Sequence, residues 1–329
     1  MSTEAAVQIP TSLVDAAAAL PPLRTAIVNA GTPLVMESVW LAAEARIIEP
    51  VLFGKRNDIK KSARALDWDI AALEIVDADD ETAAATQAAL AAGSGDVAAL
   101  MKGHVHTNTL MRAVLNKKAG LRTGRRLAHV FAMYLPDRPQ PILISDAALN
   151  VEPDEETHQA IILNCIDVAR ALGVSRPKIA LLSATEEASE AVPSSMRAAR
   201  LSEWAQGEIE TADVFGPLAL DLAVSTQSAQ IKGISNPVAG HADAIVVPEI
   251  VAGNALFKAL VNFAGACAAG LVTGARVPVL LTSRADPPAA RLASAALTSV
   301  YRHHMEASAG EKASPQTGSS AAAEQQAES

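Results

Sequence analysis

The feature that most constrains the fold of this chain is a repeated alternation of short apolar segments with longer amphipathic ones, from about Leu23 to Met305. Short apolar runs that end in small or turn-forming residues are typical of buried strands, and the segments between them have helical spacing. This order is typical of parallel strands joined by crossover helices, and it favours an α/β fold with a doubly wound sheet, in which ligands bind outside the carboxyl ends of the strands. We expect strands at residues 25–29, 50–53, 74–76, 97–101, 128–135, 141–144, 178–183, 213–215, 244–247 and 277–282.

Composition excludes several classes of protein. The 329 residues are half apolar, with 27 Lys and Arg against 36 Asp and Glu, which gives a net charge of −9. The length suggests two domains, and an acidic chain without a basic stripe is not expected to bind nucleic acid. No apolar run approaches the roughly 20 residues that span a bilayer, so we expect no membrane partner. The two cysteines, Cys165 and Cys267, are far apart and lie in apolar stretches that we expect to be helical, which fits a reducing cytoplasm.

The end of the chain differs in character from the rest. Residues 306–329 consist largely of Ala, Ser, Gly, Glu and Gln, without aliphatic periodicity. Such a segment buries too little apolar surface to offset its ordering entropy, so it is predicted to be a disordered tail.

A glycine-rich and basic segment covers residues 101–130. A strand is expected to end at Lys102–Gly103, a helix to begin at Thr107, and Arg122 to lie in a loop with further arginines. Helix amino termini and guanidinium groups both bind phosphate, so this segment is a candidate phosphate site. The alternative is an ordinary solvated basic loop.

Two further segments combine small residues with polar ones. Asp221 and Lys232 lie in the first part of residues 216–260, and Asn254 and Lys258 in the last part. Asn254 follows a glycine and could instead be a helix cap. In the other segment, residues 277–297, a buried strand ends at Ser283–Arg284, which would place a hydroxyl and a guanidinium at the cleft. Alternatively, Ser283 caps a turn and Arg284 pairs with Asp286.

Together these segments resemble the phosphate acetyltransferase and phosphate butyryltransferase family over roughly residues 23–303. The stretches that carry the resemblance, in order, are KGHVHT, AVLNKKAGLRTG, GPLALD, IKGISNPVAGHADAIVVP, AGN and LLTSRAD. The resemblance implies reversible acyl transfer between coenzyme A and phosphate, with no metal and no cofactor besides coenzyme A as a substrate. It also implies two α/β domains of the isocitrate/isopropylmalate dehydrogenase type with an interdomain cleft, in a homodimer. We expect the domains to comprise residues 1–124 plus 275–305, and 125–274.

The resemblance also suggests roles for individual residues. Ser283 and Arg284 match the family's Ser-Arg pair, in which the arginine binds an anionic group and the serine assists the transition state. Asn254 and Asp221 match cleft positions, and Lys102, Arg122 and Lys258 are further candidates for substrate binding. The archaeal-type aspartate seven residues after the serine is Ala290 here, so Asp286 is the nearest candidate base.

Several alternatives remain open. The acyl group is expected to be acetyl, with butyryl or propionyl as alternatives, because two methylenes change binding by only a few kcal/mol. A catalytically idle scaffold that senses acyl-CoA is a second possibility. A dinucleotide dehydrogenase is disfavoured because no G-x-G-x-x-G follows the first strand. A covalent route through a cysteine would need an activated thiolate, and His129 is expected to be a buried residue with satisfied hydrogen bonds rather than a metal ligand.

Overall fold

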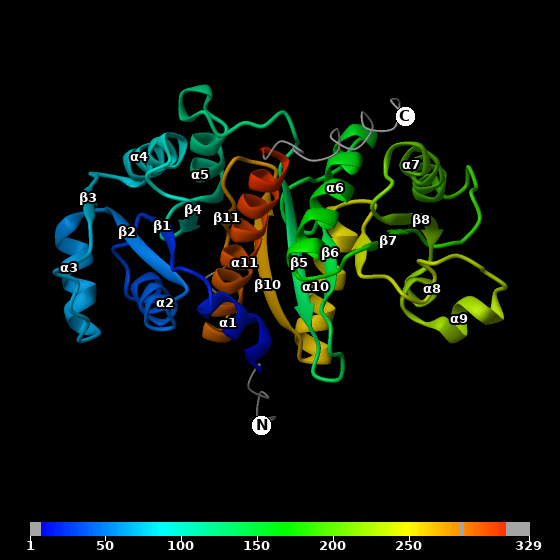
Figure 1. Ribbon diagram of the computed structural model, residues 1–329, viewed down its shortest axis with the longest axis horizontal. Helices are drawn as coiled ribbons and strands as arrows, with labels where there is room; N and C mark the ends of the chain where they lie inside the picture. The colour runs from blue at the N-terminus through cyan, green and yellow to red at the C-terminus, as the bar shows by residue number, and fades with distance from the viewer. Residues whose placement is uncertain (1–7, 283–285, 314–329) are drawn as a thin grey trace, which may run out of the picture.

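The computed structural model describes residues 8–282 and 286–313, and an 11-stranded sheet forms its centre (Figure 1). Across the sheet the strands follow the order β3-β2-β1-β4-β11-β10-β5-β6-β9-β7-β8. Every strand predicted from the sequence overlaps one of these. The strands are β1 (Leu23–Val28), β2 (Ile48–Gly54), β3 (Ile75–Asp77), β4 (Ala99–Lys102), β5 (Ala128–Tyr134), β6 (Ile142–Ser145), β7 (Lys178–Leu182), β8 (Asp213–Leu218), β9 (Ala244–Val246), β10 (Cys267–Thr273) and β11 (Val279–Leu280).

The sheet has two halves that run in opposite directions. The first half, β3-β2-β1-β4-β11, is parallel throughout. In the second half, β10 is antiparallel to both β11 and β5, so β5 still runs with the first half. β6 is antiparallel to β5, and β9, β7 and β8 follow the direction of β6. The carboxyl ends of β6, β9, β7 and β8 therefore lie at the opposite end of the sheet from those of β1, β2, β4 and β11.

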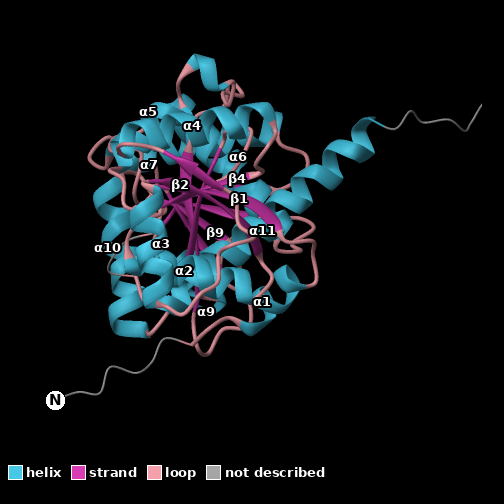
Figure 2. Ribbon diagram, turned by 90° about the vertical axis from the view of Figure 1, so that its left-hand side faces the viewer, coloured by secondary structure: helices cyan, strands magenta, loops and turns pink. Residues whose placement is uncertain are grey.

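Helices cover both faces of this sheet (Figure 2). Successive side chains of a strand point to opposite faces, so Ile27 packs with one layer of helices while Ala26 and Val28 pack with the other. One layer contains α1 (Thr11–Ala18), α2 (Pro33–Glu44), α3 (Arg56–Ala65), α6 (Glu155–Ala171), α7 (Pro193–Glu208) and α11 (Pro288–Ala313). The other contains α4 (Glu81–Ser94), α5 (Thr107–Val114), α8 (Leu220–Val224) and α10 (Ile250–Ala264), and α9 (Thr226–Ile231) follows α8.

Local signals explain where several helices begin and end. The Asp80 carboxylate accepts hydrogen bonds from the first-turn N–H groups of α4, and Asp154 does the same for α6. Such caps satisfy donors that have no partner inside the helix. Gly95 ends α4 with a φ of 90°, a conformation that glycine adopts without steric cost.

Three expectations from the sequence need correction. The stretch around Cys267 is strand β10 rather than a helix, and it joins the halves into one continuous sheet where two separate sheets were expected. The sheet is also mixed, because β10 and β6 are antiparallel to β5. Finally, α11 continues to Ala313, so the first part of the predicted tail, residues 306–313, is helical; the remainder lies outside the described residues.

Candidate active site

A cavity of about 670 Å³, which we call the active-site cavity, is lined by residues of both halves of the sheet. It brings together four residues that the sequence predicted: Lys102 at the end of β4, Asn254 and Lys258 on α10, and Asp286 just before α11. The other lining residues are Thr107, His129, Phe131, Ala147, Ala148, Phe257, Val261, Asn262, Ala266, Ala268, Leu281, Thr282, Pro287 and Ala290.

A glycine turn places Lys102 and Thr107 in this cavity. The N–H of Gly103 donates to the Val28 carbonyl at 2.9 Å, and the N–H of His104 donates to the Asn29 carbonyl at 3.0 Å. A Cβ at Gly103 would lie 2.4 Å from the Val28 oxygen, so a larger residue would push β1 and β4 apart. Gly103 therefore permits the tight connection from β4 to α5.

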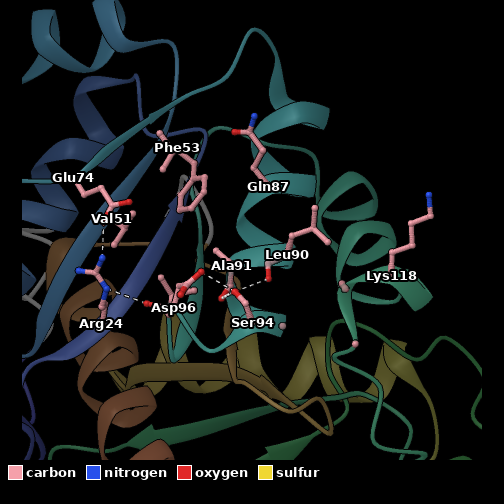
Figure 3. Close-up of a pocket in the computed structure, with 15 residues that line it drawn as sticks. Arg24, Val51, Phe53, Glu74, Gln87, Leu90, Ala91, Ser94, Asp96 and Lys118 are labelled. Carbon is pink, nitrogen blue, oxygen red and sulfur yellow. Dashed lines mark hydrogen bonds and ion pairs between the residues drawn. The ribbon is translucent and has the colours of Figure 1, made fainter.

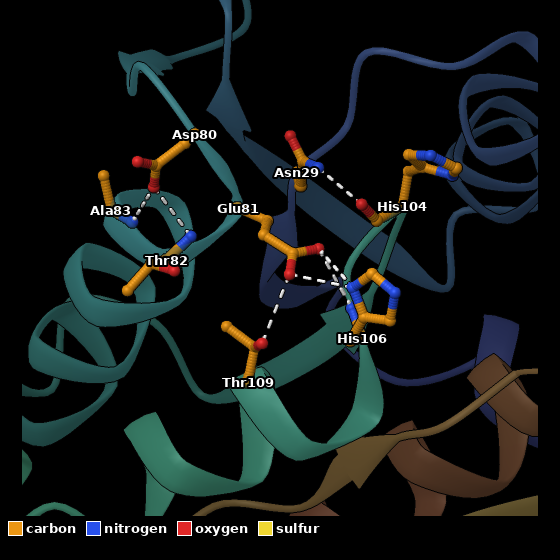
Figure 4. A network of polar contacts seen from close by, with 8 residues as sticks. All are labelled: Asn29, Asp80, Glu81, Thr82, Ala83, His104, His106 and Thr109. Atoms are coloured by element: carbon orange, nitrogen blue, oxygen red, sulfur yellow. Dashed lines mark hydrogen bonds and ion pairs between the residues drawn. The ribbon is translucent and has the colours of Figure 1, made fainter.

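A carboxylate fixes the start of α5 (Figure 4). Glu81, in the first turn of α4, accepts hydrogen bonds from the His106 N–H at 3.1 Å, from His106 Nδ1 at 2.8 Å and from Thr109 Oγ1 at 3.2 Å. The hydrogen bond from the His106 side chain is the main cause that lowers the pKa of Glu81. Because Thr107 directly follows His106, these contacts hold α5 in place at the edge of the cavity.

Asn254 lies inside α10 and does not cap it, so the capping interpretation was wrong. The cap is Glu249, whose carboxylate accepts from the N–H groups of Val251 and Ala252. Asn254 Nδ2 instead donates to the Ala147 carbonyl at 3.3 Å. The neighbouring Gly253 lets α10 approach the end of β6 closely, since a Cβ there would lie 2.7 Å from the Asp146 carbonyl oxygen.

The loop from β11 to α11 borders the cavity on both sides of a gap in the described structure. Leu281 and Thr282 line it before the gap, and Asp286 lines it afterwards. Ser283 and Arg284, the predicted catalytic pair, lie outside the described residues. Arg291, which the sequence analysis did not single out, donates from Nη1 to the Asp286 carbonyl at 2.9 Å and so holds the loop against α11.

His129 lines the cavity and is almost fully buried, but its hydrogen bonding is incomplete, contrary to the sequence prediction. Its Nδ1 atom has no hydrogen-bond partner within residues 8–282 and 286–313. Burial lowers the pKa of His129 to about 4, although the nearby Asp146 opposes this shift. The Asp146 carboxylate is already used by four donors: the N–H groups of His129, Ala148 and Leu149, and the side chain of Asn150. A neutral imidazole with an unused nitrogen therefore forms part of the cavity wall.

The other two predicted binding residues do not line this cavity. Arg122 forms a bridge with Ala275 near the start of β5. Because β5 runs in the same direction as β4, the start of β5 lies at the opposite end of the sheet from the carboxyl end of β4. Asp221 is an exposed residue of α8, the helix that follows β8. It interacts electrostatically with Lys232, whose ammonium donates to the Glu186 carboxylate at 2.8 Å. Because the two halves of the sheet run in opposite directions, the loop after β8 lies at the far end of the sheet from Lys102.

Both cysteines are buried and poorly suited to nucleophilic catalysis. Burial raises the pKa of Cys165 to about 12 and that of Cys267 to about 11. Since the thiolate is the reactive form of cysteine, neither thiol is activated in this structure.

A second cavity, of about 870 Å³, lies beside α4 and is called here the α4 cavity (Figure 3). Its apolar wall includes Val51, Phe53 and Leu90, and its charged residues include Arg24 and Lys118. Arg24 is fully occupied by Glu49, Glu74 and the Asp96 carbonyl. Lys118 and Gly120, from the segment 101–130 that the sequence marked as a candidate phosphate site, line this cavity, but none of the individually predicted site residues does.

Within the described part of the chain, no three or more His, Cys, Asp or Glu residues are grouped so that they could hold a metal ion. None of the helices in residues 8–282 and 286–313 combines the length and apolar character needed to cross a membrane.

Comparison with known proteins shows relatives along most of the chain. The phosphate acetyltransferase of Rickettsia prowazekii (strain Madrid E) is 42% identical over 85% of this chain and 80% of its own length. The phosphate acetyltransferase of Rhizobium meliloti is also 42% identical, over 88% of this chain and 92% of its own. The phosphate butyryltransferase of Clostridium beijerinckii (strain ATCC 51743 / NCIMB 8052) is 34% identical over 85% and 93%.

Solved structures and a family model agree with these relatives. The branched-chain phosphotransacylase of Enterococcus faecalis V583 has 32% identity and a TM-score of 0.76, with 86% of this chain and all of that chain covered. A phosphotransacetylase from Streptococcus pyogenes has a TM-score of 0.78 at 19% identity, over 91% of this chain and all of its own, and so shows the same fold. The family model described as phosphate acetyl/butaryl transferase matches residues 81–299. The chain therefore belongs to the phosphate acetyl/butyryl transferase family.

Proposed function

We propose that this protein is a phosphate acetyltransferase, which transfers an acetyl group reversibly between coenzyme A and inorganic phosphate. The observation that carries the proposal is the active-site cavity, where Lys102, Lys258, Asn254 and Asp286 converge from separate elements of both halves. The two ammonium groups can bind a phosphate through charge-assisted hydrogen bonds. The amide can donate to the acyl donor, and the carboxylate can accept the proton of a thiol. Acetyl is favoured over butyryl because the two acetyltransferases above are 42% identical to this chain, whereas butyryltransferase relatives are 34% and 39% identical.

The mechanism is direct transfer in a ternary complex. The thiol of coenzyme A loses its proton to a base and attacks the acetyl phosphate carbonyl, so that a C–S bond forms, the C–O bond to phosphate breaks and phosphate leaves with the electron pair. Asp286 is the proposed base. Ser283 and Arg284 are proposed to assist the transition state and to bind an anionic substrate group, as the family motif suggests. Arg122 and Asp221 remain candidates only if they act at a more distant part of the substrate.

The two halves of the sheet are proposed to act as the two domains, 1–124 plus 275–305 and 125–274, with the site in the cleft between them. We also propose a homodimer that uses α10. Val251 and Phe263 on this helix are 70% and 91% exposed, and apolar surface of this kind would be buried in a protein interface. Light scattering should show a dimer for the protein and a loss of mass for Phe263→Glu.

The decisive experiment measures kcat/KM with acetyl-, propionyl- and butyryl-CoA by phosphate-dependent release of the thiol. We expect acetyl-CoA to give the largest value. A larger value for butyryl-CoA would instead identify a phosphate butyryltransferase.

Arsenolysis of acetyl-CoA separates an enzyme from a scaffold that only senses acyl-CoA. Folded protein that binds acetyl-CoA without arsenolysis would contradict the proposed activity. Asp286→Asn and Ser283→Ala serve as matched variants, because an active-site role for both requires kcat to fall while the far-UV circular dichroism stays unchanged.

A further inference from the structure

Two phenylalanines from different elements form an aromatic wall in the active-site cavity. Phe131 of β5 and Phe257 of α10 stack with their ring centroids 4.2 Å apart and their planes 14° apart. Both rings line the cavity and both are only partly buried. We call this pair the aromatic wall.

The residues around the aromatic wall are apolar and mostly small. Val261, Ala266, Ala268 and Leu281 line the same cavity. Gly270 pairs with Phe131 across the sheet, and a Cβ there would lie 2.9 Å from the Phe131 ring, so the glycine leaves room for that ring. Phe131 also lies beside His129, with ring centroids 4.1 Å apart. The two phenylalanine rings and these apolar neighbours together form the apolar part of the cavity lining.

Polar residues lie elsewhere in the same cavity. Lys102, Thr107 and Asp286 come from the β4–α5 turn and the loop before α11, and they present charged or hydroxyl groups. The Lys258 ammonium lies 5.4 Å from the centroid of the Phe257 ring, a distance typical of a cation–π contact. The cavity therefore offers an apolar surface and charged groups to the same ligand.

From this arrangement we infer that the aromatic wall is the binding surface for the acyl chain, and that the Phe257 ring limits the length of chain the enzyme accepts. The inference rests on the proposed function, since it assigns the apolar part of that substrate to particular residues. An acyl phosphate or thioester has a polar reacting centre and an alkyl end, which match the two parts of the cavity. Phe257 is the better gate because it projects from a partly exposed helix, whereas Phe131 belongs to a central strand.

Substitutions in opposite directions test this inference. Phe257→Ala removes the ring, and we expect it to raise the ratio of kcat/KM for butyryl-CoA to that for acetyl-CoA by about 10-fold, because two additional methylenes can then be buried. Val261→Phe adds a ring one helical turn away and should lower the same ratio. Each variant is compared with wild type by thermal unfolding, so that loss of fold is recognised.

Phe263→Ala is the matched control. It removes the same ring from the same helix, but Phe263 is 91% exposed and does not line the cavity, so the ratio should stay at the wild-type value. Light scattering on Phe263→Ala checks that this control keeps the wild-type oligomeric state.

A second readout keeps this inference separate from the proposed function. Isothermal titration with acetyl-CoA and butyryl-CoA gives the ratio of the two dissociation constants without turnover. If wild type transfers no acetyl group but Phe257→Ala still shifts the binding ratio toward butyryl-CoA, the aromatic wall is supported as the binding surface for the acyl chain, and the proposed activity is wrong. If the ratios of Phe257→Ala and Val261→Phe equal that of wild type in folded protein, the acyl chain binds elsewhere and the inference is wrong.

Discussion

The α4 cavity, at about 870 Å³, and the active-site cavity, at about 670 Å³, are of comparable size, but the polar groups of the two are arranged very differently. In the α4 cavity the Arg24 guanidinium donates hydrogen bonds to Glu49, Glu74 and a backbone carbonyl. In the active-site cavity Lys102, Lys258, Asn254 and Asp286 come from three separate parts of the fold and face a common space. Convergence of polar groups from distant segments, rather than volume, distinguishes a site built for chemistry.

The largest difference in kcat/KM is expected between two variants that each lack one lysine, one in each cavity. Lys102→Gln should lower kcat/KM by about 10- to 100-fold, because a hydrogen bond from a charged donor to phosphate is among the stronger polar interactions. Lys118→Gln, the matched change in the α4 cavity, should leave kcat/KM unchanged. Equal losses in the two variants, measured by steady-state kinetics on folded protein, would abolish the distinction between the cavities.

The second effect concerns stability, since each cavity has one buried polar atom without a partner among the described residues: His129 Nδ1 and Gln87 Oε1. The pKa of His129 is about 4 in the folded protein, below its ordinary value near 6.5. The unfolded chain therefore binds the proton more readily between these values. The associated stability is complete above pH 6.5 and falls as the pH decreases toward 4, by about 3 kcal/mol.

His129→Phe tests this pH dependence because phenylalanine cannot titrate. Urea unfolding at pH 7.0, 5.5 and 4.5 should show that the variant loses less stability on acidification than wild type. Carboxylates titrate in both proteins, so the difference between the two curves isolates the imidazole. Parallel curves would mean that His129 takes up a proton as easily in the folded state as in the unfolded one.

The smallest effect is expected at Gln87. Gln87→Leu replaces a buried acceptor by an apolar side chain of similar size, and should raise the free energy of unfolding by about 1 kcal/mol without changing kcat/KM. Unlike the change at His129, this gain should not depend on pH. Gln87→Glu supplies the opposite control, because a carboxylate at the same place should lower the melting temperature.

Much of the fold was predictable because strand and helix signals are local. The buried apolar runs marked the predicted strands, and Thr107 marked the start of α5. β10 was missed because its sequence, CAAGLVT, begins with small residues that have little strand preference, and only its position between β11 and β5 makes it a strand. The direction of each strand was not predictable either, because direction depends on which strands pair and not on local sequence.

Lys102, Asn254, Lys258 and Asp286 could be singled out from the sequence because they are polar and belong to recognisable motifs, and the structure places all four around one cavity. Phe131, Phe257 and His129 were missed as site residues because an aromatic residue in a strand or helix looks like part of a core until the cavity is seen. Arg122 was predicted from a glycine-rich basic segment and Asp221 from the family motif, and neither signal contains the direction of the strands. The opposite directions of the two halves place both residues away from Lys102.

The position of β11 has a consequence for how the chain is made. This strand is encoded near the carboxyl end of the described chain, yet it lies between β4 and β10 in the middle of the sheet, and α11 after it packs on α1 and α2. A nascent chain on the ribosome therefore holds β4 with an unpaired side while the whole of the second half is synthesised. Because unpaired strand edges promote association, we expect the emerging protein to need protection by chaperones until β11 closes the gap.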